Sequence, residues 1–151
     1  MKLFLMRHGQ AFASSLDPNR GLTPEGRAEV ARVVRQSSLQ QGDIDHIMHS
    51  NVARTKETAE MVADQLVVAN ISAYPQWLAE DADIDTCVSM ISAWEDNTML
   101  VSHQPFLMQL LNYLYPENIN SLEPIQFSTA TMVCFEKTGV DAWRLQWVVS
   151  P

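Results

Sequence analysis

The sequence predicts a three-layer α/β/α sandwich, in which a mostly parallel central sheet lies between helices, an antiparallel strand comes from a C-terminal hairpin, and no cap domain is present. Strand-like and helix-like segments alternate between residues 2 and 114. Two of these strands are short and apolar throughout, which is typical of parallel strands buried on both faces. The last third instead holds two longer strand-like segments around a polar turn, which indicates the hairpin.

The composition is that of an ordinary globular protein. The chain has 151 residues, and 46% of them are apolar. We therefore expect a single domain that spans residues 1–151 and buries roughly 70% of the surface that the unfolded chain exposes. It has no membrane-spanning run and no signal-peptide pattern, and its two separated cysteines favour reduced thiols, so we expect a cytoplasmic protein without membrane contact. The net charge of −8 argues against nucleic-acid binding, although a few converging arginines would still bind an anion.

The first predicted strand is buried and ends in a polar tripeptide. Residues Lys2 to Met6 are apolar after the lysine, and Arg7, His8 and Gly9 follow at once. Ligands of open α/β sheets bind just outside the carboxyl ends of strands, so we expect a site here. The polar loop after it, Gln10 to Gly21, is then either a substrate-facing lid or surface packing.

The first helix has a clear start signal. Thr23 suits the N-cap, Pro24 the first helical position, and Glu25 the positive end of the helix. The apolar stripe, Val30, Val33 and Val34, should end before Gly42. A strand is then expected at Ile44–His49, followed by a helix that Ser50 caps and that runs to about Leu66. The next strand is expected at Ile71–Tyr74 and should end at Pro75. An acidic, irregular stretch at Gln76–Asp83 and a helix from roughly Ile84 to Glu95 follow it.

The remaining elements begin with a strand that is apolar and then abruptly polar, Thr98 to His103. Gln104 and Pro105 open a strongly apolar helix, whose inward side chains are Phe106, Leu107, Leu110, Leu111 and Leu114. The hairpin strands are expected at Ile125–Phe135 and Trp143–Val149, with Lys137-Thr138-Gly139 as their turn.

Two of the predicted strands end in a histidine, His8 and His103. If both strands are central and parallel, the two imidazoles emerge side by side at one edge of the sheet. Arg54 stands in the first turns of a helix that starts at that edge, and Arg7 precedes His8. Two histidines, two arginines and a helix N-terminus would together form a pocket suited to a dianionic phosphoryl group.

These residues resemble the motifs of the histidine phosphatase superfamily. The matching segments are Arg7-His8-Gly9, Ser50-x-x-x-Arg54-x-x-x-Thr58, Ser102-His103 before a proline, and Arg20-Gly21-Leu22-Thr23-x-x-Gly26. Gly21 and Asn51 stand where the family often has proline. The resemblance reaches about Val149, and the small size without a cap insertion is most similar to the family's phosphohistidine phosphatases.

The resemblance implies a mechanism. His8 would attack phosphorus and become a phosphohistidine, which water then hydrolyses. Arg7 and Arg54 would bind the equatorial oxygens, lower the pKa of His8 and balance charge in the transition state. His103 would hydrogen-bond the phosphoryl group, and Gly9 and Arg20 complete the implied phosphate- and substrate-binding set. The scheme requires neither a metal nor another cofactor.

One departure from the family concerns the proton donor. Larger members carry a glutamate or aspartate after the third strand within a Gly-x-Trp-Glu-Gly-like element, which this sequence lacks. Glu80, Asp81 and Asp83 are the nearby carboxylates. A general acid is worth roughly 10²–10⁴ in rate, so its absence handicaps phosphate esters more than phosphohistidine, whose imidazole is a better leaving group.

The functional interpretation is therefore a phosphohistidine phosphatase. Its substrate would be a phosphohistidine-containing phosphotransfer domain or phosphocarrier protein, admitted by an open site. The alternatives are a small-molecule phosphate-ester phosphatase that uses Glu80 or Asp81, and a non-catalytic phosphate-binding module.

Several of these residues also have structural explanations. His103 fits a hydrogen-bonded core histidine, Arg20 a solvated loop arginine, and Gln10 a side chain that either reaches the pocket or pairs with backbone. For His46 and His49, packing or surface exposure is the expectation. The two thiols, Cys87 and Cys134, have no nearby base and are not expected to react.

Overall fold

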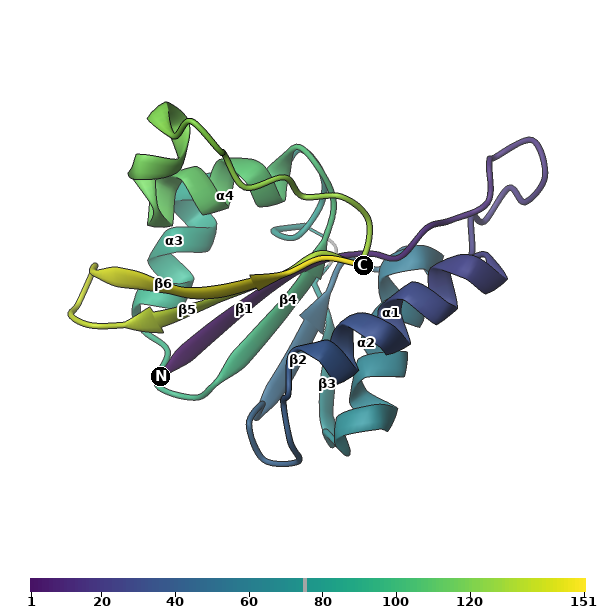
Figure 1. Ribbon diagram of the computed structural model, residues 1–151, viewed down its shortest axis with the longest axis horizontal. Coiled ribbons are helices and arrows are strands. Elements are labelled where there is room, and N and C mark those ends of the chain that lie inside the picture. Colours follow the sequence, from purple (N-terminus) through teal and green to yellow (C-terminus); the bar gives the residue numbers. More distant parts are fainter. Residues whose placement is uncertain (75) are drawn as a thin grey trace.

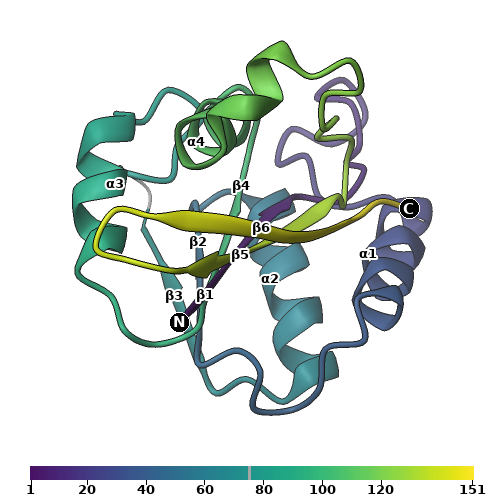
Figure 2. The ribbon, with the colours of Figure 1, turned by 60° about the vertical axis from the view of Figure 1, so that its left-hand side comes forward.

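In the part of the chain that the computed structural model describes, residues 1–74 and 76–151, six strands form one sheet in the order β3-β2-β4-β1-β5-β6 (Figure 1). Their bounds are Lys2–Arg7 (β1), His46–His49 (β2), Asn70–Ala73 (β3), Thr98–Ser102 (β4), Met132–Lys137 (β5) and Trp143–Val149 (β6). Strands β1 to β4 run parallel, and β5 is antiparallel to both of its neighbours. The C-terminal hairpin lies along one edge (Figure 2). The predicted fold class is confirmed.

Helices cover both faces of the sheet. One face packs against α1 (Pro24–Gln36) and α2 (Ala53–Leu66), and the other against α3 (Ile84–Ser92) and α4 (Phe106–Leu114). The alternation along β1 shows this division, because Phe4 and Met6 belong to the first core and Leu3 and Leu5 to the second. A 3₁₀ helix, Pro116–Asn120, follows α4 and was not expected from the sequence.

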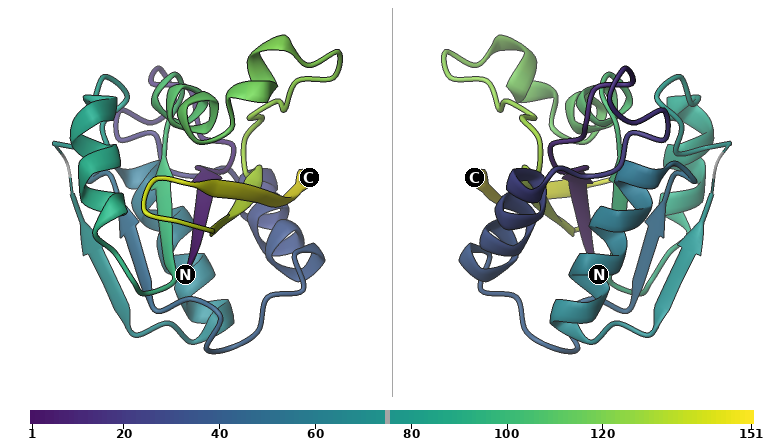
Figure 3. Two further views of the ribbon diagram at one scale, coloured as in Figure 1. Left: turned by 90° about the vertical axis from the view of Figure 1, so that its left-hand side faces the viewer. Right: turned by 90° about the vertical axis from the view of Figure 1, so that its right-hand side faces the viewer.

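The start of α1 follows the predicted signals. Thr23 is the N-cap, and its hydroxyl accepts a hydrogen bond from the backbone of Gly26 at 3.0 Å. Pro24 occupies the first helical position, and the predicted valine stripe is buried. This cap places the end of the loop after β1 against the sheet, at the end opposite the N-terminus (Figure 3).

Several predicted bounds were wrong for identifiable reasons. The helix expected to reach Glu95 ends at Ser92, because the ammonium of Lys137 donates to the carbonyls of Ser92 and Trp94. Lys137 itself belongs to β5 and not to the turn. The strand expected from Ile44 begins at His46, and the one expected at Ile71–Tyr74 is Asn70–Ala73. Pro75, expected to end that strand, lies outside the described residues.

The largest correction concerns the first hairpin strand, which begins at Met132 and not at Ile125. The preceding stretch binds other parts of the molecule: the Ile125 amide donates to Asn118 Oδ1, and the Phe127 carbonyl accepts from Arg7. Ala130 then adopts a left-handed φ of 60°. This stretch therefore passes beside the end of β1 instead of pairing along it.

The cap assigned to α2 was also wrong. Val52 is its N-cap residue, and no side chain within the described part of the chain caps it. The hydroxyl of Ser50 is engaged elsewhere, with Thr55 and His103. Within residues 1–74 and 76–151, no helix combines the length and apolar character that a membrane crossing requires.

Candidate active site

His8 and His103 lie next to each other at the carboxyl edge of the sheet. Strands β1 and β4 are parallel neighbours, with Arg7 paired to Ser102, so each histidine is the next residue after a register pair. The two ring centroids are 5.4 Å apart and the rings meet edge to face. Both residues are buried. The two predicted imidazoles therefore lie side by side, while the roles of the site residues stay predictions.

The hydrogen bond of His8 determines which ring nitrogen is free. Its Nδ1 lies 2.8 Å from the carbonyl oxygen of Gly9. A carbonyl only accepts, so Nδ1 carries the proton and the lone pair is on Nε2. Nε2 is the nitrogen that can attack an electrophile.

His8 is neutral at ordinary pH. Burial is the largest cause that lowers its pKa, which falls to about 4, and the charges of Arg54, Arg7 and Arg20 lower it further against the opposing Gly9 hydrogen bond. The arginines act in the direction the sequence predicted, but desolvation exceeds them. A neutral imidazole in a cationic pocket is the form a nucleophile needs.

Arg7 and Arg54 reach this site from different elements. Arg7 ends β1, and its NH1 donates to the Phe127 carbonyl at 2.8 Å, which orients the guanidinium. Arg54 lies in the first turn of α2. Its pKa is lowered by burial first and then by the charge of Arg20, and Glu80 opposes the shift.

Two residues that lie four positions on either side of Arg54, Ser50 before α2 and Thr58 within it, bind two parts of the site. Ser50 contacts Nε2 of His103, which follows β4. Thr58 Oγ1 accepts the Gly9 amide at 3.0 Å and donates to the Arg54 carbonyl at 2.7 Å. The Ser-x-x-x-Arg-x-x-x-Thr spacing therefore joins α2 to the ends of both β1 and β4, and places Arg54 between them.

Arg20 is held by its own loop. Asp17 folds the loop, since its carboxylate accepts from the amides of Asn19 at 2.9 Å and Gly21 at 2.8 Å. Arg20 adopts a left-handed φ of 52°, and its Nε donates to the Phe12 carbonyl at 3.1 Å. It is close enough to affect the pKa of His8 and of Arg54, so it adds a further positive charge to the site.

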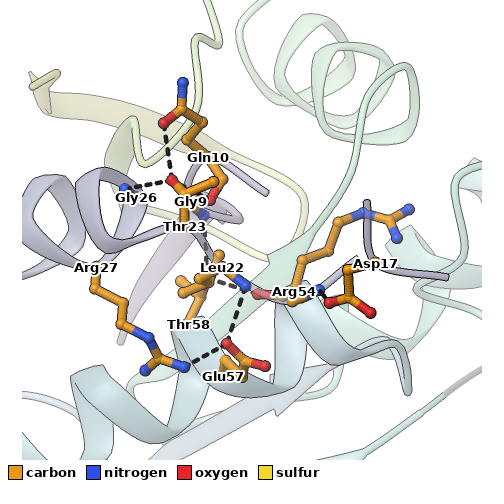
Figure 4. A network of polar contacts seen from close by, with 11 residues as sticks. Gly9, Gln10, Asp17, Leu22, Thr23, Gly26, Arg27, Arg54, Glu57 and Thr58 are labelled. Atoms are coloured by element: carbon orange, nitrogen blue, oxygen red, sulfur yellow. Dashed lines mark hydrogen bonds and ion pairs between the residues drawn. The ribbon is translucent and has the colours of Figure 1, made fainter. Parts of the chain in front are cut away.

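A polar network fastens this loop to the helices (Figure 4). Glu57 of α2 accepts from the Leu22 amide at 3.0 Å and pairs with Arg27 at 2.6 Å. The Thr23 hydroxyl donates to the side chain of Gln10 at 2.8 Å. Gln10 thus has a structural partner outside the pocket. In Figure 4 the guanidinium of Arg54 points away from the Glu57–Arg27 pair.

Glycine is required where α1 meets the chain after His8. A Cβ added to Gly26 would lie 2.1 Å from the carbonyl oxygen of Gln10, and one added to Gly9 would lie 2.8 Å from a methyl of Val30. Both residues belong to the motifs that suggested the family. Their role here is close packing that brings the Thr23 cap and His8 together.

Two hollows flank Arg54. One of about 280 Å³ is lined by Ser50, Asn51, Val52, Arg54, Ala79, Glu80, Asp81 and His103. The other, of about 580 Å³, lies between the Asp17–Gly21 loop and the start of α2, and its lining includes Arg20, Arg54 and Glu57. The first is a candidate binding pocket for the reacting group, because it joins His103 to a cation.

The carboxylates expected as alternative proton donors separate into two groups. Glu80 and Asp81 line the hollow with His103 and Arg54. Asp83 does not reach it; it is the N-cap of α3, and its carboxylate accepts from the amide and hydroxyl of Thr86 at 2.8 and 2.6 Å. The Asp83 carboxylate is therefore engaged away from the hollow, and these bonds lower its pKa.

The other residues that the sequence singled out have partners of their own or are buried as thiols. His46 is half-exposed and 3.4 Å from Asp96, and His49 is buried with its Nδ1 2.9 Å from the Ser50 carbonyl. Both thiols are buried, and burial raises the pKa of Cys87 to about 12 and of Cys134 to about 11, so neither forms a thiolate.

Sequence reasoning missed three residues that position the site. Asp17 shapes the Arg20 loop, Glu57 fastens it to α2, and Thr55 joins Ser50 at His103. The Asp-Pro-Asn turn composition was a signal for the first. No local pattern indicated Glu57, because the Leu22 amide that it binds is 35 residues away. The contact between Thr55 and Ser50 is local, but it affects the site only through His103, which is 53 residues from Ser50.

Comparison with known proteins agrees with this geometry. Residues 3–77 match the model of the histidine phosphatase superfamily (branch 1). No curated protein matches the sequence.

Solved structures match along nearly the whole chain. The protein histidine phosphatase SixA complexed with tungstate has 23% identity and a TM-score of 0.83, covering 99% of this chain and 97% of that one. A structure described as the phosphohistidine phosphatase SixA from Agrobacterium tumefaciens has 23% identity and a TM-score of 0.82, covering 99% of this chain and 97% of that one. The mycobacterial glucosyl-3-phosphoglycerate phosphatase has 13% identity and a TM-score of 0.65, covering 95% of this chain and 96% of that one. At these identities the likeness establishes the fold.

Proposed function

The chain belongs to the histidine phosphatase superfamily, and on that premise we propose that it hydrolyses phosphohistidine through a covalent phospho-His8 intermediate. Members of the superfamily are phosphatases. The observation that carries the proposal is the state of His8: a buried, neutral imidazole, its Nδ1 bound to Gly9 and its Nε2 free, among three arginines.

The chemistry follows from these groups. His8 Nε2 attacks phosphorus as the substrate imidazole leaves, so the phosphoryl group passes from one imidazole to the other. Arg7 and Arg54 hold the equatorial oxygens and offset the charge that develops on them. His103, which follows β4, lies beside His8. Water then attacks phospho-His8 and releases inorganic phosphate.

Two observations support a phosphohistidine substrate over an ester. The family's carboxylate element is missing, and Asp83, one of the three nearby carboxylates, is engaged by the cap of α3. Imidazole leaves without a strong acid, whereas an alkoxide requires one. One SixA structure contains tungstate, a phosphate-like oxyanion, in the same fold.

The substrate we propose is a phosphohistidine-containing phosphotransfer domain or a phosphocarrier protein. The fold has no cap domain, so nothing in the described residues encloses a small metabolite, and a histidine on a protein surface has access. The cytoplasmic location expected from the cysteines stays a prediction.

The deciding experiment compares substrates. Wild-type protein and the His8→Ala variant are incubated with a phosphohistidine protein, phosphoramidate and common phosphate esters. We expect wild type to release phosphate from the first two far faster than from the esters, and the variant to release none.

Two outcomes would replace the proposal. Faster cleavage of esters would favour the small-molecule phosphatase with Glu80 or Asp81 as proton donor, the alternative that their position in the hollow supports. Phosphate binding without turnover in wild type would indicate a non-catalytic phosphate-binding module.

A further inference from the structure

The proposed reaction does not use a pair of buried hydroxyls that contact His103. Ser50 is 2% exposed and Thr55 is fully buried. Ser50 Oγ lies 2.9 Å from Thr55 Oγ1 and 2.5 Å from Nε2 of His103. Thr55 Oγ1 in turn contacts the backbone carbonyls of Ser50 and, at 3.0 Å, Val52.

Counting hydrogens determines the direction of these bonds. Thr55 has one hydroxyl hydrogen, and it must go to a carbonyl, because carbonyls only accept. The contact between the two hydroxyls then needs the hydrogen of Ser50. Ser50 Oγ has only lone pairs left for His103, so Nε2 of His103 carries a proton and donates it to Ser50.

This assignment leaves Nδ1 as the one polar side-chain atom that His103 can offer to another molecule. Nδ1 is buried and has no hydrogen-bond partner among the residues that the structure describes. His103 lines the hollow with Arg54, and its ring is 5.4 Å from that of His8. When the ring is neutral, Nδ1 bears a lone pair and is a proton acceptor.

We propose that Ser50 and Thr55 hold His103 in this tautomer so that Nδ1 takes a proton from the water that hydrolyses phospho-His8. The inference rests on the proposed function and deepens it, because it assigns a base to the second step. In this scheme His103 is catalytic, and Ser50 and Thr55 are positioning residues that act through it.

The step balances without a further reactant. The water oxygen forms a bond to phosphorus while the bond from phosphorus to Nε2 of His8 breaks, and its electron pair returns to His8. One water proton passes to Nδ1 of His103 and the other stays on the phosphate, so His8 is again neutral and His103 is an imidazolium. His103 then returns its proton to solvent as phosphate departs.

The surroundings suit a base that changes strength during the reaction. Burial first, and then the charges of Arg54, His8, Arg7 and Arg20, together lower the pKa of His103 to about 3, so the ring starts neutral. The dianionic phosphoryl group on His8 would offset the arginines and raise that pKa. His103 thus becomes a stronger base when its proton acceptor role is needed.

The test separates the two chemical steps. Wild type, Ser50→Ala and Thr55→Val are mixed with radiolabelled phosphoramidate, and the formation and decay of the acid-labile phosphoenzyme are followed over time. We expect decay to slow about tenfold or more in both variants, as for other residues that orient a catalytic ligand, with formation changed far less. The phosphoenzyme therefore accumulates.

Controls distinguish positioning from damage to the fold. Thr55→Ser keeps the hydroxyl and should restore wild-type decay. Ser92 lies at the end of α3, remote from the site, and its hydroxyl donates to the Val88 carbonyl and the Asp141 carboxylate. The Ser92→Ala variant removes this hydroxyl and should change neither step. The rate of decay in wild type should also rise with pH and level off once His103 is neutral, and this rise should shift or disappear in Ser50→Ala.

Equal slowing of both steps, or no slowing of decay in either variant, would overturn the inference and leave the phosphatase proposal standing. A wild type that forms no phosphoenzyme and releases no phosphate would overturn both. If Ser50→Ala does not fold, the pair Thr55→Val and Thr55→Ser decides.

Discussion

The two ends of the sheet each present a histidine beside a hollow, and they differ in burial and charge. At the carboxyl edge His8 and His103 are buried among Arg7, Arg20 and Arg54. At the amino edge a hollow of about 370 Å³ is lined by His46, Met48, Ala93, Trp94, Glu95, Asp96 and Thr98.

The difference shows how the surroundings decide what a histidine does. His46 is 37% exposed at its side chain and its Nε2 lies 3.4 Å from a carboxylate oxygen of Asp96, so its neighbours are water and an anion. The histidines of the carboxyl edge have cations for neighbours and little water, and burial with those cations lowers their pKa. One edge therefore offers neutral nitrogen lone pairs to an anion, and the other places an exposed imidazole beside a carboxylate.

The largest expected effect on activity comes from replacing His8, the proposed nucleophile at the carboxyl edge. The comparison is the replacement of His46 at the amino edge. His8→Asn should lower phosphoramidate hydrolysis by about 10⁴-fold or more, because no other group replaces the covalent step. His46→Asn should leave the rate unchanged. Single-turnover phosphate release measures both, and an equal loss in the two variants would remove the distinction between the edges.

The next largest effect on activity is expected from replacing Arg54 at the carboxyl edge, compared with replacing Arg144 near the amino edge. Arg54→Ala should reduce kcat/KM by about 10²–10³-fold, the usual loss of a donor aimed at transition-state charge. Arg54→Lys should recover part of it, since a lysine supplies charge without the planar fork. Arg144→Ala, an exposed arginine of β6 near the amino edge, is the matched control. Steady-state kinetics would contradict the scheme if Arg144→Ala lost as much.

The buried histidines should also make the fold sensitive to acid. The folded pKa of His8 is about 4, below its ordinary value, so between pH 6.5 and 4 the unfolded chain binds more protons than the folded one. Stability therefore falls as pH decreases through this window, by on the order of 3 kcal/mol for His8 alone. Urea unfolding at several pH values should show a smaller fall in the free energy of unfolding for His8→Asn than for wild type, and an equal fall in both would contradict this prediction.

Glycines near the two edges should differ in how much an added methyl group lowers the free energy of unfolding. Gly26→Ala forces a methyl against the Gln10 carbonyl and should lower the free energy of unfolding by about 1–3 kcal/mol. Gly139→Ala, in the hairpin turn of the amino edge, meets only the Ala142 methyl at 3.3 Å and should cost much less. Chemical denaturation compares them. Similar losses would mean that the close approach near His8 has no special role.

The smallest effect is expected from the carboxylates of the carboxyl edge. Glu80→Ala and Asp81→Ala should each change phosphoramidate hydrolysis by about threefold or less, far below the roughly 10²–10⁴ of a general acid. Asp83→Ala should leave turnover intact and lower stability by about 1 kcal/mol through loss of the α3 cap. A large kinetic loss in any of them would restore the family's proton donor.

The sequence predicted most of what local chemistry decides. Thr23 caps α1 as expected, the apolar run of β1 is buried, and the hairpin turns near Gly139, since each depends on neighbours in the chain. The meeting of His8 and His103 was also predictable, because the pairing of two apolar strands determines where their ends lie.

The predictions that failed depended on partners far along the chain. Ser50 has the residue type of a cap, yet its hydroxyl contacts a histidine 53 residues away. Residues 125–131 have the pattern of a strand, but Arg7 and Asn118 bind their backbone. In each case a long-range hydrogen bond outweighed the expected role.

The four-residue spacing of Ser50, Arg54 and Thr58 restricts how this chain can change in length. Each residue added to a helix rotates the downstream residues by about 100°, so a single insertion near the start of α2 would turn Thr58 away from Gly9 while Ser50 kept its place. Homologous chains should therefore differ in length after Leu66 and remain constant between residues 50 and 58.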